Sequence, residues 1–339
     1  MNSASSFRRA VRIGTLGLAA LAIVSMVVNP VAAADQCKNR GDLDIRYCDE
    51  DGDLLADTPK DAGTWLEPET LVFSYTAVED PSVYENVFKD LMDHIAKKTG
   101  KQVKWYGPES YAAQVEAMRS GRLHISGFAA GATVYGVNLG GFHPVAMMGN
   151  KNGTFGGYRL WLITHKDSDI KTIRDLKGRK VAHVTPASNS GDQAPRALFK
   201  KEGIVPDADY KVIYSGKHDN SIMGVVNKDY DAAPVASTVM DRMIERKMFE
   251  RSAVRIIWES DQFPGSAYGY IYNLHPDLQK KVREAFLTFD WKGTGLAKEF
   301  GKQAEVFIPI DYTRHWEIIR IIQKDNKESY TLDALKKIK

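Results

Sequence analysis

Apolar and polar positions along the chain follow a pattern that predicts strands and helices in alternation. Apolar runs with the length of buried strands occupy 71–75, 102–106 and 123–128. Apolar residues at helical spacing occupy 83–95 and 110–120. Asp80 and Pro81 are suited to begin the first of these helices, and Gly100 to end it. This order is typical of an α/β unit with a largely parallel sheet.

The same alternation returns in the second half of the chain. Strands are predicted at 160–165, 180–184, 211–214, 231–235 and 254–258. Helical segments are predicted at 172–176, 188–203, 220–227, 239–247, 277–289, 293–300 and from 312 onward. We therefore predict two α/β lobes joined by a hinge, lobe 1 from 67–163 and 259–339 and lobe 2 from 164–258. Because ligands of open α/β sheets bind beyond the carboxyl ends of the strands, we expect a ligand cleft between the lobes.

Residues 1–34 have the layout of a cleavable signal peptide. The basic residues of this segment are Arg8, Arg9 and Arg12. An apolar run at 13–28 follows, and Ala32 to Ala34 supply the small residues of a cleavage site. The alternative is a membrane anchor, but this run of about 16 residues is shorter than the ~20 that span a bilayer. We expect export to the periplasm with cleavage near Ala34.

Composition and charge limit the classes of partner. Hydrophobic residues make up 43% of the chain and charged residues 26%, as is usual for globular proteins. Lys and Arg number 46 against 43 Asp and Glu. The signal segment holds arginines and no acid, so the exported part is close to neutral. We expect no nucleic-acid partner, because such a partner would need a concentrated basic face.

An irregular extension at residues 35–66 follows the signal segment. Cys37 and Cys48 are the two cysteines of the chain, and both lie in this extension. Because an exported protein matures in an oxidising compartment, we predict a disulfide between them rather than two free thiols. Closing such a short loop would contribute about 2–3 kcal/mol to stability.

The same extension carries an acidic loop that begins at Asp49. Carboxylates stand at positions 1, 3, 5 and 9 of this loop, on Asp49, Asp51, Asp53 and Asp57. That spacing lets oxygen ligands surround a hard cation. The two interpretations are a structural calcium site and a solvated acidic turn. We expect no other metal and no cofactor.

The strongest candidate for a binding site lies between a strand and a helix of lobe 2. Ser188, Asn189 and Ser190 bring hydroxyl, amide and backbone N–H groups to the start of that helix. Such an arrangement binds phosphate-like anions without a positive side chain. The alternative is plain N-capping by Ser190, which explains one serine but not the whole group.

Further candidates stand at the ends of other strands. His218 and Asp219 follow a strand of lobe 2, where His218 could donate to an anion oxygen. Asp219 could fix the tautomer of that histidine or cap the next helix. In lobe 1, Tyr75 and Phe128 end two strands, where a hydroxyl and an apolar wall could face the cleft or pack in the core.

Together these segments resemble the phosphonate-binding periplasmic proteins of ABC importers, a branch that also includes phosphite and phosphate binders. The resemblance rests on Tyr75, Gly127-Phe128, Ser188-Asn189-Ser190-Gly191, Gly216-Lys217-His218 with Asp231, and Phe263-Pro264-Gly265. It implies the bilobal type II fold of periplasmic binding proteins. It also implies that Ser188, Asn189, Ser190 and His218 bind the phosphonate oxygens, with Tyr75 donating from the other lobe.

The chain departs from this family at several positions. The family often has Tyr where Phe128 stands and Thr where Asn189 stands. Some members hold the ammonium of 2-aminoethylphosphonate with acids, at places that Thr238 and Ser266 occupy here. Either the ligand has no amine, or one of the remaining acids holds it: Glu79, Asp80 or Asp192.

The expected function is that of a monomeric periplasmic solute-binding component of an ABC importer. It would close its lobes on a phosphonate, with 2-aminoethylphosphonate as the expected ligand, and deliver it to an inner-membrane permease. Phosphite or phosphate is the alternative ligand, and delivery to a sensor is an alternative to transport. A periplasmic phosphoester or phosphonate hydrolase is a further alternative. The sequence has no H-E-x-x-H, G-x-S-x-G, P-loop or cysteine nucleophile, so we do not expect an enzyme.

Overall fold

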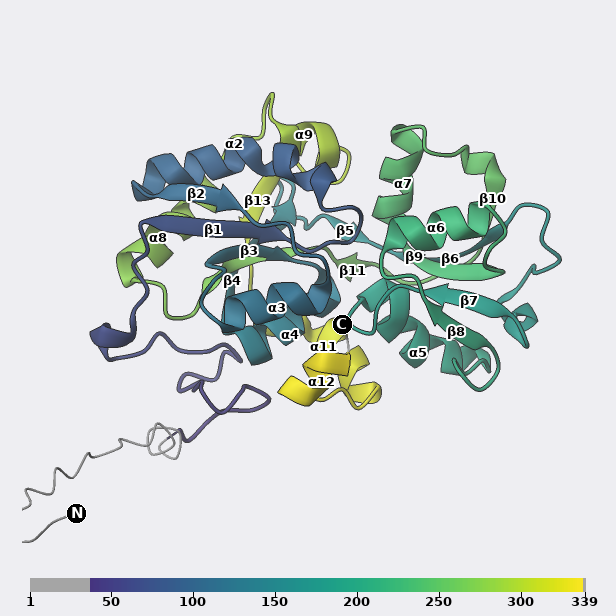
Figure 1. Cartoon of the computed structure of the whole chain (residues 1–339), viewed down its shortest axis with the longest axis horizontal. Helices are drawn as coiled ribbons and strands as arrows, with labels where there is room; N and C mark the ends of the chain where they lie inside the picture. Colours follow the sequence, from purple (N-terminus) through teal and green to yellow (C-terminus); the bar gives the residue numbers. More distant parts are fainter. Residues whose placement is uncertain (1–36, 338–339) are drawn as a thin grey trace, which may run out of the picture.

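The computed structural model describes residues 37–337, which form two α/β lobes side by side (Figure 1). Lobe 1 lies at the left of that view and lobe 2 at the right. The predicted signal segment, with its arginines and the cleavage position near Ala34, lies outside the described residues. Within 37–337, no helix has the length and apolar character needed to cross a membrane.

Lobe 1 is built around a six-stranded sheet in the order β13-β4-β12-β3-β1-β2. Its strands are β1 (Thr70–Tyr75), β2 (Gln102–Trp105), β3 (Ile125–Phe128), β4 (Phe142–Gly149), β12 (Ala267–Ile271) and β13 (Val306–Pro309). β1 runs parallel to β2 and β3, and β12 lies antiparallel between β3 and β4. Its helices are α2 (Ser82–Thr99), α3 (Tyr111–Arg119), α4 (Ala130–Gly140), α8 (Pro276–Leu287) and α9 (Gly295–Phe300). In Figure 1, α2 lies above β1 and α3 below it, so the sheet is covered on both faces.

Lobe 2 repeats this plan with a five-stranded sheet in the order β10-β6-β9-β7-β8. Its strands are β6 (Leu160–His165), β7 (Lys180–His183), β8 (Lys211–Tyr214), β9 (Ala232–Ala236) and β10 (Val254–Glu259). β7 runs parallel to β8 and β9, and β6 is antiparallel to β9. Its helical segments are η2 (Ile173–Leu176), η3 (Asn189–Gln193), α5 (Ala194–Leu198), η4 (Phe199–Glu202), α6 (His218–Val226), α7 (Ser237–Glu245) and η5 (Arg251–Ala253).

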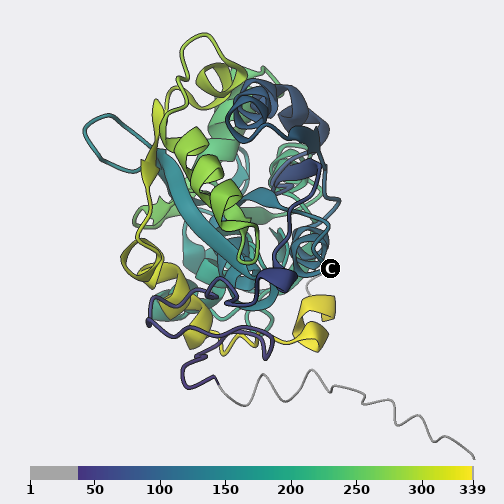
Figure 2. The ribbon, with the colours of Figure 1, turned by 90° about the vertical axis from the view of Figure 1, so that its left-hand side faces the viewer.

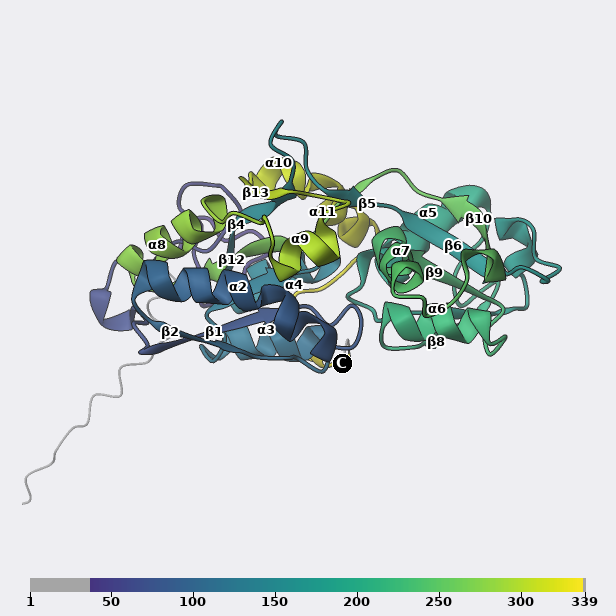
Figure 3. The same ribbon diagram turned by 90° about the horizontal axis from the view of Figure 1, so that it is seen from above.

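Two short strands carry the chain between the lobes. β5 (Gly157–Tyr158) pairs antiparallel with β11 (Phe263–Pro264), and Figure 3 shows β5 between the lobes. The predicted boundaries at 163/164 and 258/259 instead fall inside β6 and β10. β6 pairs with β9 from Leu160 to Thr164 and with β10 at His165, so it belongs entirely to lobe 2.

The C-terminal helices are α10 (Tyr312–His315), α11 (Glu317–Asp325) and α12 (Leu332–Lys337). They are not confined to lobe 1, where the sequence placed them. Gln323 Nε2 donates to the Gly131 carbonyl of α4, at 3.0 Å. Asn326 Nδ2 donates to the Gln193 carbonyl of η3, at 2.8 Å. The C-terminal segment therefore contacts both lobes.

The extension before lobe 1 is fastened at several points. The predicted disulfide between Cys37 and Cys48 is present. Arg119 of α3 donates to the Asp44 carboxylate at 2.7 Å, which attaches the extension to lobe 1. Figure 2 shows the extension running along the bottom of lobe 1, beside the C-terminal helices. It also contains the short helix η1 (Ala62–Thr64).

Among the elements without a counterpart in the sequence prediction are α4, β4, β12 and β13. Every residue of α4 is buried, so this helix has no polar face to produce an amphipathic period. β12 is likewise buried along its length, which removes the alternation expected of a half-exposed strand.

Candidate functional site

Both lobes line a cavity of about 70 Å³ where they face each other. Since one water needs about 10–15 Å³, the cavity has room for roughly five to seven non-hydrogen atoms. Its lining from lobe 1 includes Tyr75, Val78, Tyr111, Ala129, Ala130, Met148, Gly265, Ser266 and Phe300. Its lining from lobe 2 and the β5 crossing includes Tyr158, Ser188, Asn189, Ser190, His218, Thr238, Val239 and Arg242.

Five helices begin at the wall of this cavity. The lining residues in their first or second positions are Tyr111 of α3, Ala130 of α4, Asn189 of η3, His218 of α6 and Thr238 of α7. The first N–H groups of a helix have no partner inside it, and they carry the positive end of the helix dipole. The cavity therefore suits an anion, although residues 35–339 as a whole are close to neutral.

The predicted anion-binding residues open η3, a single π-helical turn that continues into α5. Ser188 is the cap, because its Oγ accepts from the Gly191 N–H at 3.2 Å. The capping role assigned to Ser190 as an alternative is therefore wrong, and Ser190 contributes to the cavity lining. Asn189 donates through Nδ2 to the Tyr158 hydroxyl at 3.0 Å. An amide can present either its oxygen or its NH₂ group to a hydroxyl, so this side chain can also donate to an anion.

A buried network behind η3 fixes the shape of this turn. Asp192 Oδ1 lies 2.7 Å from His183 Nδ1, and His183 Nε2 lies 2.8 Å from the Tyr210 hydroxyl. The Asp192 carboxylate also accepts from Arg196 Nε at 3.0 Å and from the Tyr214 hydroxyl at 3.1 Å. All these groups belong to lobe 2, so the network orients the Ser188–Ser190 loop from within its own lobe.

His218 is a neutral hydrogen-bond donor to the cavity. Its Nδ1 accepts from the Ala236 backbone N–H at 3.2 Å, so the ring proton stands on Nε2. Nε2 lies 3.3 Å from Ser188 Oγ, at the cavity wall. Burial lowers the pKa of His218 to about 3, which keeps the ring uncharged at neutral pH.

Three tyrosines add hydroxyl groups. The Tyr75 hydroxyl lies 3.1 Å from Ser266 Oγ, and the Tyr158 hydroxyl accepts from Asn189 Nδ2. The Tyr111 hydroxyl faces Ser188 without completing a hydrogen bond among the residues of 37–337. Burial raises the pKa of all three, that of Tyr158 to about 12, so all three keep their protons.

A cluster of ion pairs that includes the lining residue Arg242 joins the lobes beside the cavity. Glu79 follows β1 in lobe 1, and its Oε1 lies 2.7 Å from Arg242 Nη2 of α7 in lobe 2. Arg246 of α7 reaches both Glu79 and Glu299 of α9, and Arg242 Nε lies 3.0 Å from Glu299. Burial acts to raise the pKa of Glu79, but the arginine charges and hydrogen bonds outweigh it and the pKa is lowered.

Two of the predicted site residues lie away from the cavity wall. Phe128 is fully buried in lobe 1, with its ring 4.8 Å from that of Phe142, so it packs in the core. The Asp219 carboxylate accepts from the backbone N–H of Asn220 and, across the lobes, of Asp80. The Ala236 N–H takes the role that we expected of Asp219, that of fixing the His218 tautomer.

The structure also adds residues that the sequence reasoning missed, among them Tyr111, Tyr158 and Arg242. Tyr111 follows Ser110, whose hydroxyl caps α3 by accepting from the Ala113 N–H. Because serine is a common helix cap, the sequence could have indicated that α3 begins at Tyr111. Tyr158 lies in the crossing between the lobes, and no local pattern indicated its place.

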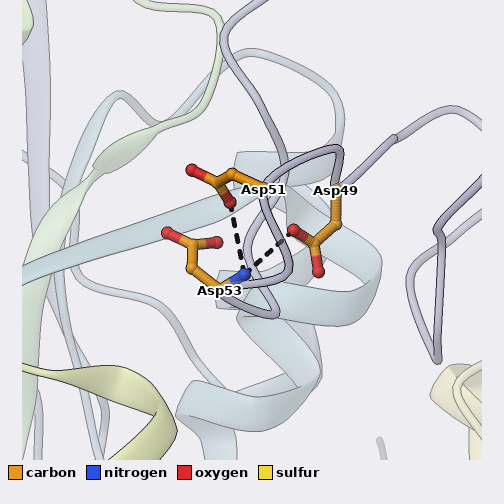
Figure 4. A group of neighbouring side chains, drawn as sticks. All are labelled: Asp49, Asp51 and Asp53. Atoms are coloured by element: carbon orange, nitrogen blue, oxygen red, sulfur yellow. Dashed lines mark hydrogen bonds between the residues drawn. The ribbon is translucent and has the colours of Figure 1, made fainter.

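The acidic loop brings together three of its four predicted ligands. Carboxylate oxygens of Asp49, Asp51 and Asp53 lie within 4.8 Å of one another (Figure 4). The Asp57 carboxylate instead accepts from the Glu50 backbone N–H at 2.7 Å. Asp49 is largely buried and accepts from backbone N–H groups of its own loop, which the solvated-turn interpretation also explains. The calcium site stays a prediction.

Comparison with known sequences identifies the class of protein that this site belongs to. A sequence model of the family described as ABC transporter, phosphonate, periplasmic substrate-binding protein matches residues 73–316. The chain belongs to this family of transport components, as the sequence resemblance indicated. Among curated relatives, the phosphate-import protein PhnD of Mycolicibacterium smegmatis is 29% identical over 241 residues, 68% of this chain and 75% of that protein.

Solved structures confirm the fold. The binding protein component of an ABC phosphonate transporter from Pseudomonas aeruginosa has a TM-score of 0.67 at 22% identity, over 76% of this chain and 87% of the other. A Prochlorococcus marinus protein in complex with methylphosphonate has a TM-score of 0.67 at 17% identity, over 77% of this chain and 99% of the other. The fold is the bilobal type II fold of periplasmic binding proteins.

Proposed function

We propose that this protein is exported to the periplasm and captures a small phosphorus oxyanion between its lobes. The ligand is a phosphonate, phosphite or phosphate, and the protein delivers it to an ABC permease of the inner membrane. 2-Aminoethylphosphonate, the ligand that the sequence analysis favoured, carries the same head group. A monomer is sufficient for this role, because both walls of the cavity come from one chain.

The observation that carries this proposal is the set of donors around the cavity. Five helix N-termini, the neutral His218 and the tyrosine and serine hydroxyls surround a space of about 70 Å³. A small oxyanion needs many hydrogen-bond donors and fits in a small cavity. Names of similar proteins support the same class, since one is called a phosphate-import protein and another was solved with methylphosphonate.

Capture without chemistry is favoured over hydrolysis by the state of His218. A hydrolase would need a base to take the proton of Ser188 or Ser190. His218 faces Ser188 through Nε2, the nitrogen that carries the proton, and its lowered pKa reflects a site that disfavours imidazolium. The same histidine can donate to a ligand oxygen, which is the role that capture needs.

Calorimetry with phosphate, phosphite, methylphosphonate and 2-aminoethylphosphonate tests the proposal. At least one ligand is expected to bind and, at 100 times its Kd, to add about 2.7 kcal/mol to the free energy of unfolding. Absence of binding by all four would refute the proposal. Release of free phosphate from a phosphonate would instead show an enzyme.

Export is a separate part of the proposal, and it depends on the signal segment. Secretion of the full chain from a bacterial host, followed by N-terminal sequencing of the periplasmic product, is expected to give a start near Asp35. Retention of residues 1–34 in the membrane fraction would point to an anchor.

A further inference from the structure

We infer that the cavity selects phosphorus oxyanions whose substituent carries no ammonium, because no carboxylate of residues 37–337 lines it and arginines pair with the buried carboxylates beside it. This inference rests on the proposed function and concerns the part of the ligand beyond its phosphorus head. It assigns Arg242 as the residue that determines this specificity.

No carboxylate lines the cavity within residues 37–337. Arg242 is the lining side chain that carries a full charge, and it is 4% exposed. An ammonium inside the cavity would therefore meet a guanidinium and no acid. Burying an ion without a counter-charge costs free energy, because the ion loses its hydration and gains no partner.

Glu79 is the buried acid that directly follows the lining residue Val78 in the sequence. Its carboxylate is already shared between Arg242 at 2.7 Å, Arg246 and the Tyr84 hydroxyl at 2.7 Å. A ligand ammonium would have to displace a guanidinium to reach it. Glu79 therefore neutralises Arg242 rather than a ligand.

The other acids that the sequence offered for an amine are also taken. Asp192 is paired with Arg196 and hydrogen-bonded to Tyr214. Asp80 is exposed, and its carboxylate accepts from the Ser82 N–H at 3.0 Å. Neither side chain lines the cavity.

An aromatic ring is the other common partner of an ammonium. Phe300 lines the cavity, but the Arg242 guanidinium lies 5.2 Å from its ring centroid. Tyr75 packs against Tyr84 and Phe88, with ring centroids 4.7 Å and 5.0 Å away. Arg242 thus occupies both an acid and a ring that an amine would use.

The lining favours a short apolar substituent instead. Val78, Met148 and Val239 contribute apolar surface to the cavity wall. An alkyl group gains from leaving water at such a surface, whereas an ammonium of the same size loses.

The matched pair of ligands is propylphosphonate and 2-aminoethylphosphonate, which have the same number of non-hydrogen atoms. Calorimetry on the whole exported protein, at a pH where both phosphonates are dianions, is expected to show propylphosphonate binding at least about tenfold more tightly. Equal affinity, or tighter binding of 2-aminoethylphosphonate, would overturn the inference. If neither ligand binds and phosphate, phosphite and methylphosphonate also fail, the proposed function itself is refuted.

Arg242→Met tests the residue assignment, with Arg196→Met as the matched control. Both arginines pair with a buried carboxylate, but only Arg242 lines the cavity. The ratio of the two dissociation constants is expected to shift at least about threefold toward 2-aminoethylphosphonate in Arg242→Met and to stay unchanged in Arg196→Met. An equal shift in both variants, or none in either, would contradict the assignment. The ratio for the unsubstituted protein stands as a test even if a variant fails to fold.

Discussion

Two buried carboxylates flank the cavity, Asp192 in lobe 2 and Glu79 in lobe 1, and they differ in where their partners come from. Asp192 contacts His183 and Arg196 of its own lobe. Glu79 contacts Arg242 and Arg246 of the opposite lobe. The Asp192 network can persist when the lobes separate, whereas the Glu79 cluster exists only when they meet. The first therefore shapes the Ser188–Ser190 loop, and the second holds the lobes together, which in the proposed function stabilises closure around the ligand.

Asp192→Ala is expected to have the largest effect on the free energy of unfolding. The substitution leaves Arg196 without its buried partner and removes the acceptor of Tyr214 within a folded lobe. We expect the free energy of unfolding in urea to fall by about 3–5 kcal/mol. A loss below about 1 kcal/mol would show that this network contributes little to the fold.

Glu79→Gln is expected to act on binding more than on folding. The variant weakens the contacts of Arg242 and Arg246 in the closed form, while water can solvate both arginines when the lobes are apart. Affinity for the preferred phosphonate is expected to fall by about 2–3 kcal/mol, with a smaller change in unfolding free energy than Asp192→Ala produces. The reverse order of effects, measured by calorimetry and urea unfolding, would contradict the assignment of Glu79 to the contact between the lobes.

Ser190→Ala removes one hydrogen-bond donor of the Ser188–Ser190 loop without changing the shape of the loop. Ser190 is neither the helix cap nor part of the Asp192 network, so its loss should leave stability within about 0.5 kcal/mol. Loss of a hydrogen bond to a charged ligand should reduce affinity by about 1.5–3 kcal/mol, and His218→Asn should do the same. Unchanged affinity in both variants would place the ligand elsewhere.

The smallest effect, counted per pH unit, concerns acid. Burial lowers the pKa of His218 from 6.5 to about 3, so between these values the unfolded chain binds a proton that the folded chain does not. Stability should therefore fall as pH is lowered from 6.5 toward 3, by about 1.4 kcal/mol per pH unit from this residue. The free energy of unfolding of His218→Asn, subtracted from that of the unsubstituted protein, isolates this slope. His143, whose pKa burial lowers to about 4, is present in both proteins and cancels. A flat difference would contradict the buried neutral state of His218.

The sequence predicted the parts of the fold that have one polar and one apolar side. α2 is an example, since Gly100 ends it and its buried residues recur at helical spacing. α4 could not be recognised in this way, because all its residues are buried. The lobe boundaries depend on which strands pair, and that is a three-dimensional property.

The site was predictable where a motif carried it and not where distant segments meet. Ser188 to Ser190 and His218 follow strands of lobe 2 and line the cavity as expected. Of the two alternatives for Phe128, the structure shows packing in the core, because a strand end does not decide which face of the sheet a side chain occupies. Glu79 and Asp192 looked alike in sequence, and only their arginine partners distinguish a contact between lobes from one within a lobe.

A crystal structure of the protein with methylphosphonate would show directly whether the ligand binds between the lobes. Phosphorus oxygens are expected within hydrogen-bonding distance of Ser190, His218 and Tyr158, at the cavity between the lobes. Methylphosphonate bound only in the groove beside Arg320 and Lys324, between the N-terminal extension and the C-terminal helices, would contradict it.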